Sequence, residues 1–440
     1  MNPREAALAA LERCRRDGAW SGSAIDAAIK KYALDRRDAA LASRLCLGVL
    51  QNSRLLDFYI NFYSSIPADK LEEKVRDILR MGIYQLTMLD KIPARAAVNE
   101  SVALCKSCGC GRASGLVNAV LRKIADSAGN LPPVPGEGTA EYLSIMYSHP
   151  QWIGEKITKQ QGYAFTEEFL AANNSPAPLD LQVNTLKTGK EDIVRSLLRL
   201  EMPFSLPEYP ENCLSLKGGN VSALPGFEEG LFYVQDRAAA MAVQILDLKP
   251  GMQVLDACAA PGGKTFAAAI AMENKGSILS CDIHEKKLPL IQKGAARLGL
   301  DIIHTRRADA REPMPELTGR FDAVIADVPC SGLGVIRRKP EIRWKDQAEL
   351  DNLPAIQRDI LEGLAPCVRA GGVLLYSTCT VRTRENGGTV SAFLADHPEF
   401  TPEGFILPGS IGEVPSGQIT LWPHLHGTDG FYICKMRKKS

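Results

Sequence analysis

The sequence predicts a multidomain protein: an all-α bundle, then a small α+β domain, then an α/β domain with a mostly parallel seven-stranded sheet. Three observations carry this prediction. Residues 3–130 place apolar side chains at helical spacing without a strand pattern between them. Residues 131–138 then hold three prolines and two glycines, which cannot continue a helix. From about residue 235, strand-like and helical segments alternate, which is typical of a parallel sheet covered on both faces.

The composition fits a globular protein with more than one core. Hydrophobic residues make up 45% of the 440 residues and charged residues 23%. The 12 cysteines are spread along the chain and do not resemble a disulfide framework. The chain contains no apolar run long enough for a membrane span and does not begin with a signal-peptide pattern. We therefore expect a cytoplasmic protein that does not span a membrane.

The charge is unevenly distributed although the net charge is only +1. Residues 1–130 carry 20 Lys+Arg against 14 Asp+Glu, and the remainder carries 32 against 37. A mildly basic front part suits a polyanionic partner. Uneven surface decoration explains the same numbers equally well.

The expected domain boundaries follow from these patterns. Residues 1–130 form a bundle of about five to seven helices, and residues 131–150 form a linker. Residues 151–234 form the small domain, with helices at 152–173 and 190–200 and a strand at 179–183. Residues 235–440 form the α/β domain. Its strands are expected at 252–257, 277–282, 302–306, 321–327, 372–378, around 402–407 and at 430–436, with helices at 264–272, 285–298 and 352–369.

A cofactor pocket is expected at the turn from Asp256 to Thr265, where a strand ends and a helix begins. Small residues there let the backbone approach a ligand closely. A Walker loop would need glycine at the position of Cys258, and no dinucleotide glycine pattern is present. Asp282, at the next strand end, suits ribose hydroxyls, and Asp309, after the third strand, suits the amine of adenine. This favours S-adenosylmethionine over NAD or ATP, with helix capping as the alternative role for both acids.

Two cysteines follow two further strands: Cys330 in Asp327-Val328-Pro329-Cys330 and Cys379 in Ser377-Thr378-Cys379. Methyl transfer to carbon 5 of a pyrimidine needs a thiol, because that carbon is too poor a nucleophile until a thiolate adds to carbon 6. A second acid or base nearby would help to remove the carbon 5 proton. Asp327 is suited to holding the amine and ring nitrogen of cytosine, which favours cytosine over uracil. Burial as small hydrophobic residues is the alternative for both cysteines.

Three segments carry a family resemblance. Residues 256–265, 327–334 and 376–380 resemble the motifs of the NOL/NOP/Sun family of RNA cytosine-5 methyltransferases. Residues 97–102 and 115–122 resemble the NusB fold. The pairing covers essentially the whole chain and is similar to that of bacterial Sun/RsmB-type small-subunit ribosomal RNA methyltransferases. It implies a NusB-like bundle followed by a Rossmann-like methyltransferase domain.

The resemblance also implies the roles of individual residues. Cys379 would attack carbon 6, and Cys330 would assist release of the methylated product. This choice between the two cysteines rests on the resemblance alone. The implied cofactor site consists of Cys258, Ala259, Ala260, Pro261, Gly262, Gly263, Lys264, Asp282, Asp309 and Asp327. Lys264 would contact the substrate or the cofactor carboxylate.

RNA contacts are expected in the stretch Ile336–Lys345, which holds five basic residues and Trp344. Basic side chains neutralise phosphate and tryptophan stacks on bases, although a solvated loop with its tryptophan in the core is the alternative. Gln182 stands where the family generally has arginine, which leaves the RNA contacts of that region in doubt. No metal is expected, because the Cys105–Cys110 cluster lacks a fourth ligand.

The sequence therefore predicts an S-adenosylmethionine-dependent methyltransferase that modifies carbon 5 of a cytosine in small-subunit ribosomal RNA. A transfer-RNA enzyme of the same family is one alternative. An RNA-binding assembly or antitermination factor with an inert methyltransferase core is another, and the presence of both cysteines argues against it.

Overall fold

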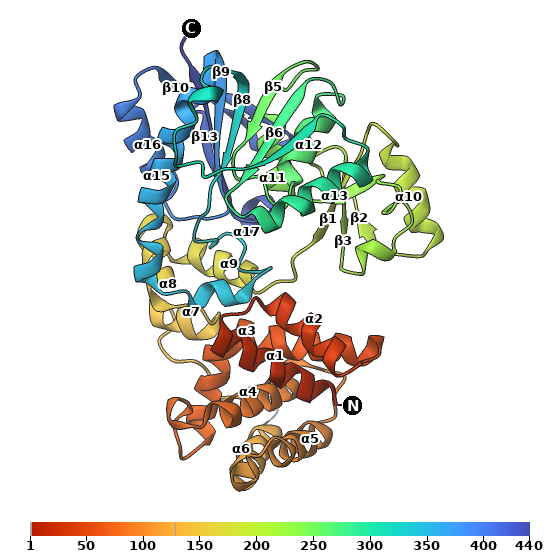
Figure 1. Ribbon diagram of the computed structural model, residues 1–440. Coiled ribbons are helices and arrows are strands. Elements are labelled where there is room, and N and C mark those ends of the chain that lie inside the picture. The colour runs from red at the N-terminus through yellow and green to blue at the C-terminus, as the bar shows by residue number, and fades with distance from the viewer. Residues whose placement is uncertain (1, 128) are drawn as a thin grey trace. The chain divides into compact units, whose positions relative to one another are not determined.

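A computed structural model of the chain describes residues 2–127 and 129–440 (Figure 1). Contacts divide the chain into two compact units. The first contains the chain up to Ser175 together with Ile336–Lys345, and the second contains Pro176–Val335 and Asp346–Ser440. A ten-residue segment from late in the sequence therefore belongs to the helical unit at the front.

The first unit is helical, as predicted. Its first helix shows how the sequence sets the ends: the Asn2 side chain accepts from Arg4 N, Pro3 occupies the first turn, and Gly18 ends the helix at φ 59°. Leu45, Leu56 and other apolar side chains form one continuous core. The helices are α1 Pro3–Asp17, α2 Ser21–Lys31, α3 Arg36–Tyr63, α4 Glu73–Met88, α5 Ala94–Ser107, α6 Ser114–Asp126, α7 Ala140–Met146, α8 Gln151–Gln161 and α9 Tyr163–Asn173.

Helices α8 and α9 pack with this first unit, although the sequence analysis groups residues 151–173 with the small domain. Helix α7 packs on both α3 and α8, and α8 packs on α9, so the three helices extend the bundle. Phe169 and Leu170 of α9 are fully buried. Helix α7 also lies within residues 131–150, the stretch expected to be a linker, so only residues 131–139 and 147–150 of that stretch lie outside helices.

The second unit begins with a small antiparallel sheet in the strand order β2-β3-β1-β4. The strands are β1 Leu179–Val183, β2 Phe204–Ser205, β3 Cys213–Leu216 and β4 Phe232–Val234, and helix α10 spans Lys190–Arg199. Leu181, Leu214 and Phe232 bury their side chains against Ile193 and Leu197 of α10. This is the α+β fold that the sequence predicts.

The main sheet has the order β10-β14-β9-β8-β5-β6-β7, with β13 added beside β14. Strands β5 to β9 are mutually parallel, and β10, β13 and β14 run antiparallel to their neighbours. The strands are β5 Gln253–Asp256, β6 Ser277–Asp282, β7 Ile303–Arg307, β8 Phe321–Asp327, β9 Val368–Thr378, β10 Phe400–Pro402, β13 Gln418–Leu421 and β14 Phe431–Lys438. The sheet therefore has eight strands rather than seven, because β13 was not predicted. The strand expected around 402–407 divides between β10 and β11 Phe405–Leu407, which pairs with β12 Gly412–Val414.

Helices cover both faces of this sheet (Figure 1). Successive residues of a strand point to opposite faces, so Val254 joins one apolar cluster and Leu255 the other. The first cluster includes residues of α11 Arg237–Gln244, α12 Gly263–Ala271 and α13 Leu288–Leu298; the second includes residues of α15 Leu353–Leu364 and α16 Gly387–Asp396. Short helices α14 Gln347–Leu350 and α17 Pro423–His426 complete the unit. The parallel strands bring their carboxyl ends to one edge, where ligands bind in such folds.

Candidate active site

The two cysteines that follow β8 and β9 lie side by side. The Sγ atoms of Cys330 and Cys379 are 3.2 Å apart, and both residues are partly exposed. The parallel register that pairs Asp327 with Ser377 brings the two loops together although they are distant in the sequence. Both sulfurs therefore lie together beyond the carboxyl ends of β8 and β9.

The loops that carry these cysteines are locked together by short contacts. The Ser331 and Thr380 hydroxyls are 2.7 Å apart, and Gly334 N donates to Cys379 O at 3.0 Å. A Cβ added at Gly334 would lie 1.8 Å from Gly430 O, so only glycine fits this approach. These contacts fix the two loops, and therefore the two sulfurs, relative to each other.

A buried carboxylate beneath the loops was not predicted. Glu385 Oε2 accepts from Ser331 N at 2.8 Å and from Gln357 Nε2 at 3.1 Å. Glu385 Oε1 accepts from Arg382 Nη1 at 3.2 Å, and the same glutamine amide donates to Pro329 O at 3.1 Å. These residues come from α15 and the loop after Cys379, and their spacing matches no catalytic pattern. Their hydrogen bonds position the loop on which Cys330 lies.

The surroundings of Cys330 make its thiol harder to ionise. The hydrogen bond with Cys379 and then burial raise the pKa of the Cys330 thiol well above its usual range. The nearby charges of Glu385 and Asp327 act in the same direction. The cause of this shift is the contact between two segments far apart in the sequence, which sequence reasoning could not establish.

Asp327 and Lys264, both predicted site residues, form an ion pair. Lys264 Nζ lies 2.6 Å from Asp327 Oδ2, and Ser377 Oγ donates to Asp327 Oδ1 at 2.9 Å. The Lys264 side chain is 9% exposed and its ammonium lies 5.0 Å from the centre of the Phe431 ring. The Asp327 side chain is 31% exposed, so it remains accessible to a ligand while its neighbours fix its orientation.

A cavity of about 290 Å³ lies beside this ion pair. Five of the predicted cofactor residues line it: Cys258, Ala260, Asp282, Asp309 and Asp327. Pro329 also lines it and directly precedes Cys330 in the chain. The remaining predicted residues (Ala259, Pro261, Gly262, Gly263 and Lys264) form the adjoining turn and helix start and are not part of the lining.

The turn after β5 needs its small residues. Gly262 has φ 113°, a conformation that favours glycine, and its N–H donates to Ala259 O at 2.7 Å. Asp282 fastens this turn to β6, because its carboxylate accepts from Ala260 N at 3.3 Å and from His284 N at 2.8 Å. Asp282 is thus held at the cavity wall by backbone groups.

Two further acids at this edge have distinct environments. Arg311 pairs with Asp309 through side-chain nitrogens at 2.5 and 3.0 Å, which lowers the pKa of Asp309. Asp256 is fully buried behind the turn, where its Oδ2 accepts from Thr265 Oγ1 at 2.7 Å. Burial raises the pKa of Asp256 to about 7. The first acid stays ionised in the cavity, and the second serves the turn.

Gln182 and Arg343, two residues of regions where RNA contacts were considered, are both buried. Gln182 is 5% exposed and donates to Gln235 O at 3.0 Å, so it supports the backbone at that point. Arg343 is fully buried in the helical unit, where it donates to Gln51 O at 2.8 Å and to Ser148 O at 2.9 Å. Of the five basic residues in the stretch 336–345, where RNA contacts are expected, Arg343 and also Arg337 (8% exposed) are therefore buried.

No cluster of His, Cys, Asp or Glu in residues 2–127 and 129–440 is arranged to hold a metal ion. In the same part of the chain, no helix is long and apolar enough to cross a membrane.

Three family models match the chain. The model described as 16S rRNA methyltransferase RsmB/F matches residues 243–437, the NusB family matches residues 1–126, and an RsmF/B-like ferredoxin-like domain matches residues 149–222. Together with the sheet, the paired thiols and the cavity, these matches define a methyltransferase that uses S-adenosylmethionine and carries a NusB-type helical domain.

Individual relatives narrow this class. A probable ribosomal RNA small subunit methyltransferase B of Bacillus subtilis (strain 168) is 35% identical over 443 residues, which cover 99% of this chain and 98% of that protein. The ribosomal RNA small subunit methyltransferase B of Pseudomonas putida is 33% identical over 443 residues, which cover 100% of this chain and 99% of that protein. The crystal structure of PH0851 matches with a TM-score of 0.81 at 28% sequence identity, and the match covers 100% of this chain and 99% of that one. The chain belongs to the ribosomal RNA small subunit methyltransferase B family.

The cavity fits the cofactor of this class. Its volume of about 290 Å³ is at the lower end of small-molecule sites, which span roughly 300–1,000 Å³. Its wall carries Asp282 and Asp309, two acceptors for a nucleoside, beside a turn that leaves backbone N–H groups at the start of α12. The two carboxylate acceptors suit the ribose hydroxyls and the amine of an adenosine.

Proposed function

We propose that this protein transfers the methyl group of S-adenosylmethionine to carbon 5 of a specific cytosine in small-subunit ribosomal RNA, through a covalent bond between Cys379 and carbon 6. The observation that carries the proposal is the pair of sulfurs 3.2 Å apart beside an adenosine-sized cavity. The ribosomal RNA substrate is supported by the names of the relatives in Bacillus and Pseudomonas.

Cys379 acts as the nucleophile. The choice of Cys379 rather than Cys330 as the thiolate rests on the family resemblance of residues 376–380. Its Sγ bonds to carbon 6, and the electron pair of the 5,6 double bond makes carbon 5 nucleophilic. S-adenosylmethionine supplies an electrophilic methyl group for that carbon.

Release requires two further events. Once Cys330 has given its proton to water, its thiolate takes the proton from carbon 5. The electron pair of that C–H bond re-forms the 5,6 double bond, and the bond between Cys379 and carbon 6 breaks with its electron pair returning to Cys379 Sγ. Cys330 assists this step, because its sulfur lies 3.2 Å from the sulfur that must be expelled. Its raised pKa makes it a strong base whenever it is deprotonated.

Asp327 and Lys264 hold the reacting base. The Asp327 carboxylate, oriented by Lys264 Nζ at 2.6 Å and Ser377 Oγ at 2.9 Å, accepts from the amine of cytosine. Uracil offers a carbonyl at the same position and is disfavoured by repulsion between acceptors. Asp282 and Asp309 hold the ribose and the adenine of the cofactor in the adjoining cavity.

RNA containing 5-fluorocytosine tests this chemistry. Fluorine cannot leave as the proton does, so the enzyme and cofactor should form a stable covalent adduct with small-subunit ribosomal RNA. Cys379→Ala should abolish the adduct, and Cys330→Ala should accumulate a protein–RNA species even on ordinary RNA. Cys367→Ala, a buried thiol outside the site, serves as the matched control. The opposite pattern for the first two variants would exchange their roles.

The same assay separates the alternatives. Adduct formation on fluorinated transfer RNA but not on ribosomal RNA would favour a transfer-RNA enzyme, against which the NusB-family match at residues 1–126 argues. Failure of the wild-type protein on every RNA would favour an assembly factor with an inert core.

A further inference from the structure

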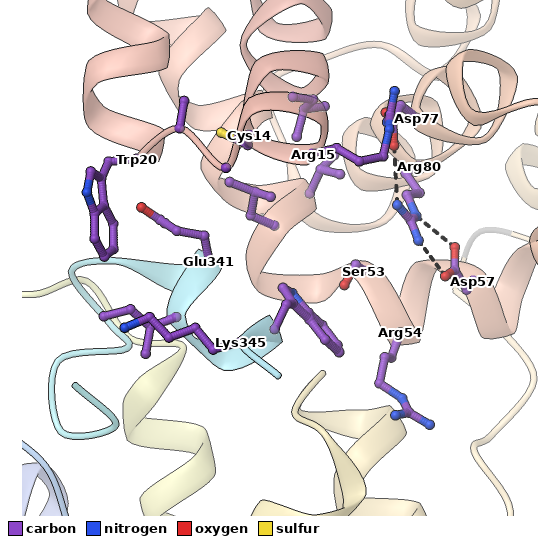
Figure 2. Close-up of a pocket in the computed structure, with 17 residues that line it drawn as sticks. Cys14, Arg15, Trp20, Ser53, Arg54, Asp57, Asp77, Arg80, Glu341 and Lys345 are labelled. Carbon is purple, nitrogen blue, oxygen red and sulfur yellow. Dashed lines mark hydrogen bonds and ion pairs between the residues drawn. The ribbon is translucent and has the colours of Figure 1, made fainter. Parts of the chain in front are cut away.

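A second cavity lies in the helical unit, outside the catalytic domain. It encloses about 620 Å³ between α1, α3, α4 and the inserted segment Ile336–Lys345. Figure 2 shows Trp20 and Glu341 on one side of it and Asp57, Asp77 and Arg80 on the other. None of the residues that line this cavity belongs to the proposed catalytic or cofactor site.

On the wall formed by α1, α3 and α4, the charged side chains of Arg15, Asp57, Asp77 and Arg80 pair with one another. Arg80 pairs with Asp57 through two nitrogens at 2.6 and 2.7 Å and contacts Asp77 at 3.2 Å. Arg15 also pairs with Asp77. The dashed lines in Figure 2 mark the contacts of Arg80 with Asp57 and Asp77. Because these charges neutralise one another, they attract a charged ligand only weakly.

The mouth of the cavity differs from this wall. Trp344 is 40% exposed, and its ring has no aromatic or cationic partner among the residues that the structure describes. Arg54 lines the cavity without an ion pair within that same part of the chain. The Ser53 hydroxyl also lines it. An open indole face, a free guanidinium and a hydroxyl therefore occur together.

A second indole adds positive charge nearby. Trp20 is 46% exposed and lies 4.6 Å from Lys339 Nζ and 5.7 Å from Lys345 Nζ, measured to the ring centre. Cations placed along an aromatic rim are typical of surfaces that bind single-stranded nucleic acid, where bases stack on rings and phosphates meet Lys and Arg.

We propose that this cavity binds one unpaired nucleotide of the RNA substrate, with its base stacked on Trp344 and its phosphate held by Arg54. The volume of about 620 Å³ admits a nucleotide. The inference rests on the proposed RNA substrate but not on the catalytic chemistry. The nucleotide bound here is distinct from the methylated cytosine.

The insertion gives this site a covalent link to the catalytic loop. Trp344 and Cys330 are separated by a short stretch of chain that leaves the second unit at Val335 and enters the first at Ile336. A bound nucleotide thus contacts the segment that continues directly from the proposed catalytic thiol.

Binding of transcribed small-subunit ribosomal RNA to the full-length protein, without cofactor, tests the proposal. Trp344→Leu removes the ring on which one base stacks and should lower the affinity for RNA by roughly five- to hundredfold. Trp344→Phe keeps an aromatic ring and should recover part of the lost affinity. Arg54→Gln should lower the slope of log affinity against log salt by about one. Trp152→Leu, in the same unit but outside the cavity, is the matched control.

Wild-type affinity and salt slope in both Trp344→Leu and Arg54→Gln would overturn the proposal. Unchanged RNA binding with weaker binding to assembled small-subunit particles would also overturn it, because the occupant would then be a protein. Cys379→Ala should bind RNA as the wild type does. A failure of adduct formation and a failure of this site are therefore separate outcomes.

Discussion

Replacing Arg343 with methionine should destabilise the helical unit more than the same replacement of a surface arginine does. Helix α3 leaves regular geometry at Asn52, with φ −120° and ψ 16°. In a regular helix, the Leu55 N–H would donate to Gln51 O. Here that N–H donates to Ser148 Oγ at 3.2 Å, and Gln51 O accepts from Arg343 Nη1 at 2.8 Å. The guanidinium therefore satisfies a group that the kink exposes.

The magnitude follows from the number of hydrogen bonds. Arg343 also donates to Ser148 O and Asn174 Oδ1, each at 2.9 Å. Each hydrogen bond of a charged donor contributes about 1.5–3 kcal/mol, and part of the sum is offset because the buried cation regains hydration on unfolding. Burial lowers the pKa of Arg343 to about 9, so it remains charged at neutral pH. We expect Arg343→Met to lower the free energy of unfolding by about 3–5 kcal/mol.

Thermal unfolding and hydrogen exchange provide the measurement. For a unit of this size the loss corresponds to a fall of at least roughly 6 °C in Tm. Amide protection should fall in Ile336–Lys345 and around Asn52 while the catalytic sheet stays protected. Arg95→Met, at an exposed position in the same unit, is the control. A shift of Arg343→Met no larger than that of the control would refute the reasoning.

Three further predictions concern the catalytic unit. Lys264→Met removes the ammonium 2.6 Å from Asp327 and should lower kcat on the order of a hundredfold; an unchanged kcat would contradict the proposed role. Because Asp256 titrates near pH 7 when folded and near pH 4 when unfolded, its stabilisation is full below pH 4 and is lost as pH rises to 7. In urea unfolding between about pH 4 and pH 7, the free energy of unfolding of Asp256→Asn should therefore rise relative to that of the wild type by about 1.4 kcal/mol per pH unit. A difference between the two proteins that does not change with pH would count against this reasoning. Hydrogen peroxide should join Cys330 and Cys379 in a disulfide with release of two waters, reversibly under dithiothreitol; peptide mapping that finds neither thiol oxidised would exclude this.

The catalytic edge could be predicted because parallel strands impose it. Asp256, Asp282 and Asp327 end buried strands, and parallel pairing puts such ends at one edge of a sheet. The expectation that Lys264 lies near the site also follows, since it begins the helix after the first of these strands. The local pattern thus located the residues without any knowledge of side-chain contacts.

Other features had no local pattern to reveal them. Strand β13 is four residues long and pairs only with β14 at its side of the sheet. Glu385 and Gln357 meet beneath the Cys330 loop from separate elements, so their contact depends on the folded chain. The basic stretch at 336–345 has a composition typical of an RNA-binding loop, yet Arg343 is buried because carbonyl oxygens of the helical unit surround it.

The sequence by itself determined the order of helices and strands, because apolar periodicity and strand–helix alternation are local properties that each segment carries. It also determined which side chains follow each strand. Only the tertiary structure decided that the Sγ atoms of Cys330 and Cys379 lie 3.2 Å apart, and that ten residues after the catalytic loop pack into the helical unit. Both depend on distances between segments far apart in the chain, and such distances exist only once the two cores have formed.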